Sequence, residues 1–264
     1  MPQITSAQNP RVKRAVRLRD ARQRRSQRRL LIDGVREIGR AIAAGVVLHE
    51  VFVCPALCGG EHAAALLERL RPTGAEWFEV AESVFTKLAF GQRSEGVVAV
   101  AEPPCTSLGA VRLPAKPLVA VLEAIEKPGN VGAVLRSADG AGVDAVVVAD
   151  PRTDLFNPNA VRASLGTLFT LSVAEASGPE ALAWLRERGL HVVAARVDGS
   201  VPYTEVDYRR PTALVLGNEA AGLSSLWQAP DVTAVRLPML GVADSLNVSA
   251  AAAVLLYEAR RQRG

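Results

Sequence analysis

Apolar positions follow two different spacings along the chain, and the two spacings alternate. Short runs rich in Val, Ala and Leu predict strands, and stretches in which apolar residues recur every three or four positions predict helices. A basic stretch, RVKRAVRLRDARQRRSQRR, covers residues 11–29 and is expected to be helical. The strands predicted after it cover 29–32, 47–53, 77–80 and 96–100, with helices over 35–44 and about 63–70 and a short helix before the last strand.

The second half of the chain has longer continuous apolar runs. Runs that are apolar on both faces and separated by helices predict a parallel sheet covered on both sides. The final helix is apolar for most of its length, which predicts that it is buried, in part against a second subunit. The strands predicted here cover 117–122, 145–148, 168–173, 191–195, 213–216 and 234–237, and the final helix runs from about 245 to 261.

A proline-rich segment separates the two halves. Four prolines fall within residues 101–117, where apolar periodicity is weak, and this composition is typical of a linker. We therefore predict an α/β protein with a smaller N-terminal domain over 1–101, a linker over 102–116 and a parallel-sheet domain over 117–264.

Composition excludes several classes of protein. At 49% hydrophobic and 22% charged residues, the chain of 264 residues can bury real cores, which excludes disorder, collagen and coiled coil. The longest apolar stretch without charge, 245–257, is 13 residues long and is shorter than the roughly 18 that span a membrane. The N-terminus has no secretory signal, and three cysteines fit reduced thiols, so we expect a cytoplasmic protein without a membrane segment.

Charge is distributed unevenly. Residues 1–40 hold 12 basic and 3 acidic side chains, a net charge of +9, whereas the whole chain carries +4. Clustered arginines bind phosphates and release counterions, so this segment predicts a nucleic-acid contact; a solvated helix or an organelle transit peptide are the alternatives. The arginines expected to contact RNA are Arg22, Arg24, Arg25, Arg28 and Arg29.

Polar loops follow several of the strands in the second half, at the edge where ligands bind to open parallel sheets. The spacing of Gly140, Gly142 and Ala145 matches a dinucleotide fingerprint but closes a helix instead of opening one, and no P-loop sequence occurs. Gly142 is better interpreted as a helix C-terminal glycine. Zinc would need the group His49, Cys54, Cys58 and His62, which we interpret as a surface loop, so no metal is predicted.

Three segments at this edge combine glycines with polar residues. Each has a structural alternative when taken alone: Gly132 allows close helix packing, Gly217 and Gly222 fit turns, and Ser245 fits a helix N-cap. Together and in this order, however, they resemble the signature motifs of the SpoU/TrmH family of RNA ribose 2'-O-methyltransferases. The three segments are Asn130-x-Gly132-x-x-x-Arg136, Gly217-Asn218-Glu219-Ala220-Ala221-Gly222, and Pro238-Met239 followed by Ser245-Leu246-Asn247-Val248-Ser249.

The resemblance covers nearly the whole chain. It includes Asn157-Pro158-Asn159 with Arg162, Ser164 and Gly166, and the N-terminal sequences ITSAQNPRVK and LIDGVREI. The N-terminal portion is similar to a small substrate-binding domain of ribosomal-protein type that occurs in the rRNA-modifying branch. The resemblance thus implies methylation of RNA, most of all 23S rRNA, with tRNA or an antibiotic-resistance site in rRNA as alternatives and a non-catalytic RNA-binding protein as the rival class.

The family also implies a cofactor, a topology and an assembly. S-adenosylmethionine would be bound where the chain forms a trefoil knot, in a homodimer joined through the C-terminal domain. Site residues carry over by position: Asn130, Arg136, Glu219, Ser245 and Asn247 to the reaction centre, and Arg162 to RNA binding. The cofactor pocket would be lined by Leu216, Gly217, Leu237, Met239, Ser245 and Leu246.

Overall fold

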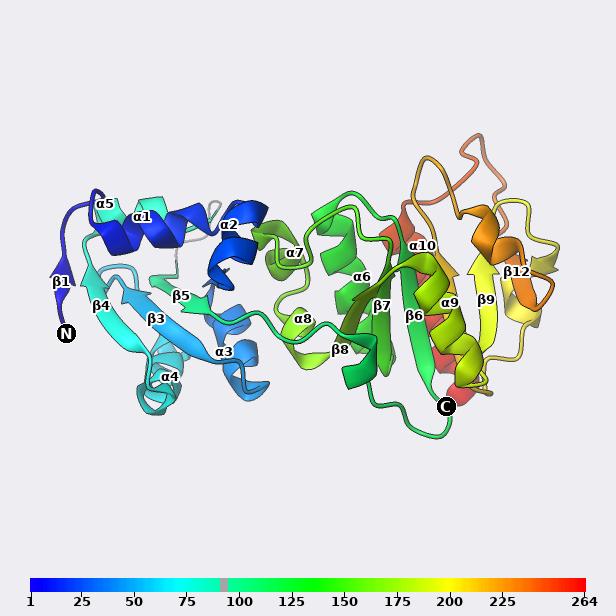
Figure 1. Cartoon of the computed structure of the whole chain (residues 1–264), viewed down its shortest axis with the longest axis horizontal. Coiled ribbons are helices and arrows are strands. Elements are labelled where there is room, and N and C mark those ends of the chain that lie inside the picture. Colours follow the sequence, from blue (N-terminus) through cyan, green and yellow to red (C-terminus); the bar gives the residue numbers. More distant parts are fainter. Residues whose placement is uncertain (91–94) are drawn as a thin grey trace. The chain divides into compact units, whose positions relative to one another are not determined.

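The computed structural model describes residues 1–90 and 95–264 (Figure 1). The chain forms two compact units, and the first contains a segment from the middle of the chain. The N-terminal unit comprises Met1–Pro104 and Asp154–Thr170, and the C-terminal unit comprises Cys105–Thr153 and Leu171–Gly264. The domain ranges predicted from the sequence place residues 154–170 in the C-terminal domain instead.

The N-terminal unit is built around a five-stranded mixed sheet in the order β1-β4-β3-β5-β2, in which β5 runs antiparallel to both of its neighbours. The predicted elements between residues 29 and 101 are confirmed with small shifts of their ends. The strands are β1 (Gln3–Ile4), β2 (Leu30–Asp33), β3 (Leu48–Val53), β4 (Glu76–Val80) and β5 (Val97–Ala101), and the helices between them are α3 (Val35–Ala43), α4 (Glu61–Leu70) and α5 (Glu82–Leu88).

The single basic helix predicted at the N-terminus is wrong, because the segment forms two helices. These are α1 (Pro10–Arg17) and α2 (Ala21–Gln27). Asp20 starts the second helix by accepting a hydrogen bond from the backbone N–H of Gln23 at 3.0 Å. An aspartate in this position caps a new helix more readily than it continues an existing one. Arg28 then ends α2 in the left-handed conformation, with φ of 50°.

The segment 154–170 packs on the N-terminal unit through α7 (Pro158–Ala163), which contacts β2, and α8 (Thr167–Thr170), which contacts α3. Two arginines fix it: Arg24 pairs with Asp154 at 2.9 Å, and Arg40 donates to the carbonyl oxygen of Leu165 at 2.8 Å. The strand predicted over 168–173 is therefore wrong in its first half, since a short apolar run fits a buried helical turn as well as a strand.

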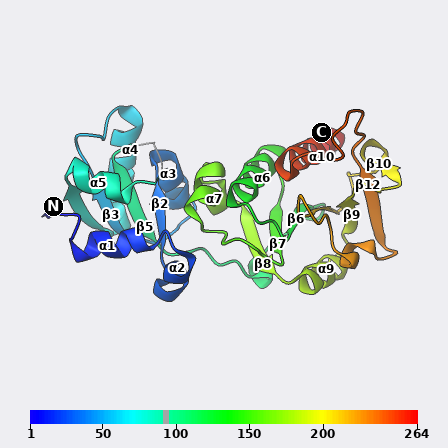
Figure 2. The same cartoon turned by 90° about the horizontal axis from the view of Figure 1, so that it is seen from above.

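The C-terminal unit contains a seven-stranded sheet in the order β10-β12-β9-β11-β6-β7-β8, and its paired strands are all parallel. Figure 2 shows α6 and α10 on one face and α9 on the other, which confirms the predicted doubly covered parallel sheet. The strands are β6 (Leu118–Glu123), β7 (Ala145–Ala149), β8 (Ser172–Ala176), β9 (His191–Ala195), β10 (Val201–Pro202), β11 (Thr212–Leu216) and β12 (Val232–Arg236), and the helices are α6 (Pro128–Ala141), α9 (Gly178–Glu187) and α10 (Val248–Arg263). The knot that the family resemblance implies stays a prediction.

The final helix, α10, packs against α6 and begins later than predicted. Its N-cap is Asn247, which accepts a hydrogen bond from the backbone N–H of Ser249 at 3.0 Å. Ala252 and Leu256 are completely buried within the unit, whereas Val254 and Tyr257 are 38% and 52% exposed. The helix therefore has one face in the core and a second apolar face at the surface. Among the described residues, no helix is long and apolar enough to cross a membrane.

Candidate active site

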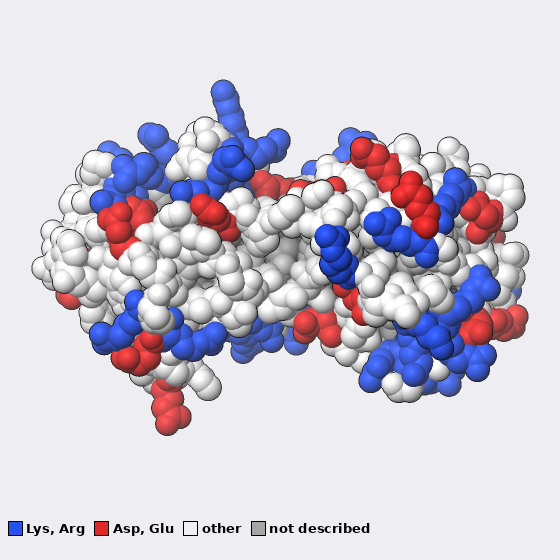
Figure 3. All heavy atoms as spheres, turned by 60° about the horizontal axis from the view of Figure 1, so that its bottom comes forward, with Lys and Arg blue, Asp and Glu red and all other residues white. Residues whose placement is uncertain are grey.

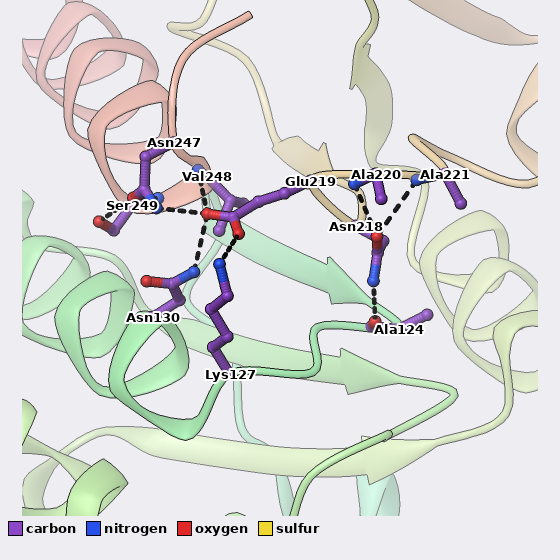
Figure 4. A network of polar contacts seen from close by, with 10 residues as sticks. All are labelled: Ala124, Lys127, Asn130, Asn218, Glu219, Ala220, Ala221, Asn247, Val248 and Ser249. Carbon is purple, nitrogen blue, oxygen red and sulfur yellow. Dashed lines mark hydrogen bonds and ion pairs between the residues drawn. The ribbon is translucent and has the colours of Figure 1, made fainter.

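Three loops meet at the carboxyl edge of the C-terminal sheet (Figure 4). One follows β6 and leads into α6, one follows β11, and one follows β12 and leads into α10. Because the strands are parallel, their carboxyl ends share one edge, and loops far apart in sequence come together there. The contacts between these loops converge on Glu219.

The Glu219 carboxylate accepts hydrogen bonds from the other two loops. Oε2 pairs with Lys127 Nζ at 2.9 Å, and Oε1 accepts from Asn130 Nδ2 at 2.8 Å. Oε1 also accepts from Asn247 Nδ2 and, at 3.4 Å, from the backbone N–H of Val248. Asn130, Glu219 and Asn247, three of the five residues predicted for the reaction centre, thus form one connected network.

The charge of Glu219 is stabilised by its neighbours. The hydrogen bond from Lys127 lowers the pKa of the carboxyl group. Burial opposes this effect, and the backbone N–H of Val248, the charge of Lys127 and the Asn130 amide lower the pKa further. A carboxylate with a lowered pKa is a weak proton acceptor at neutral pH. Glu219 is therefore suited to holding Lys127, Asn130 and Asn247 in place.

The loop after β11 is pinned to the end of β6. Asn218 Nδ2 donates to the carbonyl oxygen of Ala124 at 3.0 Å, and its Oδ1 accepts from the backbone N–H of Ala220 at 2.8 Å. A Cβ atom at Gly217 would lie 2.5 Å from the carbonyl carbon of Gly222, so this close approach requires glycine. Sequence reasoning assigned no role to Asn218 or Lys127, although both lie within or beside the segments that it singled out.

Two predicted reaction-centre residues stand outside the network. Arg136 lies on α6, six positions after Asn130, so the two residues do not share a face of the helix. It is exposed and forms no hydrogen bond or ion pair with any residue that the structure describes. Ser245 is likewise exposed and has no hydrogen-bond partner within 1–90 and 95–264.

The predicted cofactor residues lie at the ends of β11 and β12. Leu216 is the buried last residue of β11, Leu237 and Met239 are partly buried after β12, and Leu246 is 41% exposed. The backbone of residues 238–246 forms no hydrogen bond with a described residue. These free N–H and C=O groups, beside apolar side chains, fit a ligand that is held by backbone contacts, such as the adenine and ribose expected from the resemblance.

An open groove of about 1020 Å³ lies beside the loop that follows β11. It lies along the ends of β6, β7, β8 and β11, and its wall includes Ala124, Asn218 and Ala220. The volume is large enough for a nucleotide-sized ligand. Residues 237–246 do not line it, so these predicted cofactor residues lie outside the groove.

The arginines predicted to bind RNA differ in how accessible they are. Arg22, Arg25 and Arg28 are not buried, and Arg29 pairs with Glu102 at 3.3 Å. Arg24 does not fit its predicted role: it is only 4% exposed, and it pairs with Asp154 and donates to the carbonyl oxygens of Leu18 and Arg19. Arg162 is partly buried and donates to the carbonyl oxygen of Phe90.

The residues considered for zinc are engaged elsewhere. Cys54 is buried in the N-terminal core, and His49 Nε2 lies 3.1 Å from Glu102 Oε1. Within the described part of the chain, no group of three or more His, Cys, Asp or Glu residues could hold a metal ion.

Comparison with known proteins identifies the family. The family model described as the SpoU rRNA methylase family matches residues 117–257, which contain the whole Glu219 network. The chain belongs to the SpoU rRNA methylase family. A second model, described as an MRM3-like substrate-binding domain, matches residues 9–99.

Individual SpoU relatives match over the full length. A Bacillus subtilis protein named 23S rRNA (guanosine(2553)-2'-O)-methyltransferase RlmP is 30% identical over 98% of this chain and 100% of its own. A solved structure of an RNA 2'-O ribose methyltransferase is 41% identical, covers 99% of both chains and has a TM-score of 0.87. The SpoU methyltransferase AviRb from Streptomyces viridochromogenes, solved with AdoMet, is 31% identical, with a TM-score of 0.88 and coverage of 97% of this chain and 98% of its own.

These findings confirm the predicted family, the predicted enzyme class and the predicted methyl donor. The protein is an RNA 2'-O-methyltransferase that uses S-adenosylmethionine.

Proposed function

We propose that this enzyme methylates the 2'-hydroxyl of one ribose in 23S rRNA. The observation that carries the proposal is the full-length likeness to a relative named for 23S rRNA, which includes the substrate-binding domain over residues 9–99. A likeness confined to the catalytic domain would not favour rRNA over tRNA.

The cofactor supplies an electrophilic methyl group: the S–CH₃ bond breaks, an O–CH₃ bond forms and the hydroxyl proton leaves. Catalysis then depends on aligning the ribose oxygen with that methyl group. The free backbone groups of residues 238–246 and the close approach at Gly217 fit such a ligand. In this proposal the cofactor is held by Leu216, Gly217, Leu237, Met239, Ser245 and Leu246.

The network around Glu219 would position the amides of Asn130 and Asn247 against the ribose. Arg136 is free of partners in the described part of the chain, which suits a residue that engages RNA phosphate. A guanidinium stays protonated at any working pH, so Arg136 would stabilise the developing alkoxide and would not accept the proton. The proton would pass to solvent.

The proposal is tested by incubating the purified protein with S-adenosyl-[methyl-³H]methionine and either ribosomal RNA or tRNA. We expect tritium in 23S rRNA, at a single nucleotide found by mapping 2'-O-methyl groups in ribosomes from cells with and without the gene. Incorporation into tRNA alone would contradict the proposed substrate. Binding of RNA without any methyl transfer would contradict the reaction.

The accessible arginines at α2 are proposed to contact RNA phosphates. Changing Arg22, Arg25 and Arg28 to Gln should weaken RNA binding and flatten its salt dependence, by up to about 0.9 log unit of slope for each phosphate that is no longer neutralised. Arg24→Gln serves as a contrast within the same helix. It breaks the buried ion pair with Asp154, so we expect it to lower the free energy of unfolding by about 3 kcal/mol. An unchanged slope in the triple variant would show that α2 is a solvated face.

A homodimer through the exposed face of α10 is also proposed. The support is an apolar surface formed by Val254 and Tyr257, 38% and 52% exposed, on a helix whose other face is in the core. Val254→Arg should give monomers in light scattering and reduce activity. Ala183→Arg, at an exposed position of α9, is the control. A wild-type chain that is monomeric and fully active at micromolar concentration would contradict the dimer.

A further inference from the structure

Basic side chains gather at the amino edge of the C-terminal sheet, opposite the edge that carries the Glu219 network. Figure 3 shows them as a blue area at the lower right. They come from the segments that lead into β6, β9 and β11 and from the end of α10. We call this set the amino-edge surface; it comprises Lys116, Arg186, Arg188, Arg209, Arg210, Arg260, Arg261 and Arg263.

Arg263 holds this surface together. Its guanidinium donates to the carbonyl oxygens of Lys116, Tyr208 and Arg210 at 2.8 Å each, and to that of Pro117 at 3.0 Å. The end of α10 is thus tied to the chain entering β6 and to the chain entering β11. Consequently Lys116 and Arg210, which are far apart in sequence, are fixed to the same guanidinium through their carbonyl groups.

The cations of the surface divide into paired and free groups. Arg186, Arg209 and Arg261 form ion pairs with Asp231, Asp207 and Glu258 at 2.7–2.8 Å, and Arg188 pairs with Glu187 at 3.8 Å. Lys116, Arg210 and Arg260 are exposed, and none of them pairs with a carboxylate in the part of the chain that the structure describes. Three cations that form no ion pair with a described residue therefore face solvent on one edge of the unit, and one of them, Arg210, also lies close enough to Asp207 to help lower the pKa of that carboxyl group.

One of the free cations borders a groove of about 400 Å³. Its walls include Arg210, His191 and both members of the Arg186–Asp231 ion pair, whose charges offset each other. Burial lowers the pKa of His191, and the nearby charge of Arg210 lowers it further, with Asp207 opposing. The neutral form of His191 is therefore favoured, and Arg210 contributes the positive charge in a groove wide enough for a phosphate group.

We propose that the amino-edge surface binds the RNA phosphate backbone, as a second contact away from the site of methyl transfer. This inference rests on the proposed function, because it takes RNA to be the substrate. Arginine and lysine side chains with no carboxylate partner are the groups that exchange counterions for phosphates. The net charge of the sequence did not indicate such a surface, because residues 41–264 hold 19 basic and 24 acidic residues and are therefore acidic on balance.

The test compares charge-neutralised variants in an RNA-binding assay. The variant Lys116→Gln/Arg210→Gln and a control in the same unit, Arg112→Gln/Arg236→Gln, each lose two exposed positive charges that form no ion pair with a described residue. Binding of 23S rRNA is measured across a KCl titration, and methyl transfer is measured under single-turnover conditions with saturating RNA. We expect the amino-edge variant to bind about tenfold more weakly at moderate salt, with a slope reduced by about 1.4 to 1.8 log units. Its rate at saturation should match the wild type.

The outcomes separate this inference from the proposed function. If the variant and the control bind RNA with the wild-type slope while methyl transfer is normal, the amino-edge surface does not contact RNA and the proposed function stands. If no RNA is methylated but the salt dependence of RNA binding is still reduced in the amino-edge variant alone, the amino-edge surface contacts RNA and the proposed function is wrong. Weaker binding of the variant to phosphatidylserine vesicles, with RNA binding unchanged, would assign the surface to a membrane and overturn the inference.

Discussion

Arg136→Ala is expected to lower the single-turnover rate of methyl transfer by about 100-fold or more, the reduction expected for one preorganised electrostatic group. Arg136 is exposed on α6 and has no partner in the described chain, so its removal leaves the fold and cofactor affinity unchanged. Arg136→Lys should restore little activity, because an ammonium group cannot bind two phosphate oxygens in the planar fork of a guanidinium.

The Arg136 experiment needs RNA already bound, so that weakened association is not mistaken for slow chemistry. Cofactor binding is followed by calorimetry, and Arg71→Ala serves as a control at an exposed arginine that pairs with Glu68. A rate within a few-fold of the wild type for Arg136→Ala would exclude the proposed role.

Glu219→Ala should reduce methyl transfer by about 100-fold or more, for a different reason. It removes the acceptor shared by Lys127, Asn130 and Asn247, and these donors would then no longer have a common orientation. Asn247 is also the N-cap of α10 and follows the predicted cofactor loop, so cofactor affinity should fall as well. Glu219→Gln keeps one oxygen acceptor but loses the charge, and its activity should be intermediate.

The pH dependence gives a second measurement on Glu219. Its pKa is lowered in the folded protein, so the ionised network is stable above the ordinary glutamate value of 4.5 and is lost only as pH falls through the lowered pKa. Across neutral and mildly alkaline pH the wild type and Glu219→Gln should therefore have rate profiles of the same shape. Glu205→Ala, at an exposed carboxylate of the same unit, should leave activity unchanged. A rate that titrates with Glu219 near neutral pH would make it a proton acceptor and contradict the positioning role.

Local patterns were sufficient for much of the fold. Apolar runs with few charges located the strands of the C-terminal sheet except β10, because a strand buried on both faces leaves no position for polar residues, whereas β10 is a two-residue edge strand. Gly142 was predicted to end a helix, and it ends α6 in the left-handed conformation with φ of 72°. Patterns failed at 168–171, where the apolar run is too short to distinguish a turn of helix from a strand.

The site was predictable in part. Its position at the carboxyl edge follows from a parallel sheet, and the motif resemblance selected Asn130, Glu219 and Asn247. The shared acceptor at Glu219 and the role of Lys127 were not predictable, because residues 92 positions apart meet only when the sheet is assembled. Composition could not distinguish Arg24 from its accessible neighbours, because its partner Asp154 lies 130 positions away.

By itself, the sequence determined the alternation of strands and helices, the parallel C-terminal sheet and the residues of the three motifs, since these depend on local periodicity and on short polar segments. Tertiary structure decided which side chains share a partner. It placed residues 154–170 in the N-terminal unit, buried Arg24, and used Arg263 to bring Lys116 and Arg210 to one edge. These features depend on contacts between segments that are distant in sequence. A buried charge needs a partner, and a backbone carbonyl group without one accepts a hydrogen bond from a nearby side chain, so tertiary contacts determine which cations remain unpaired at the surface.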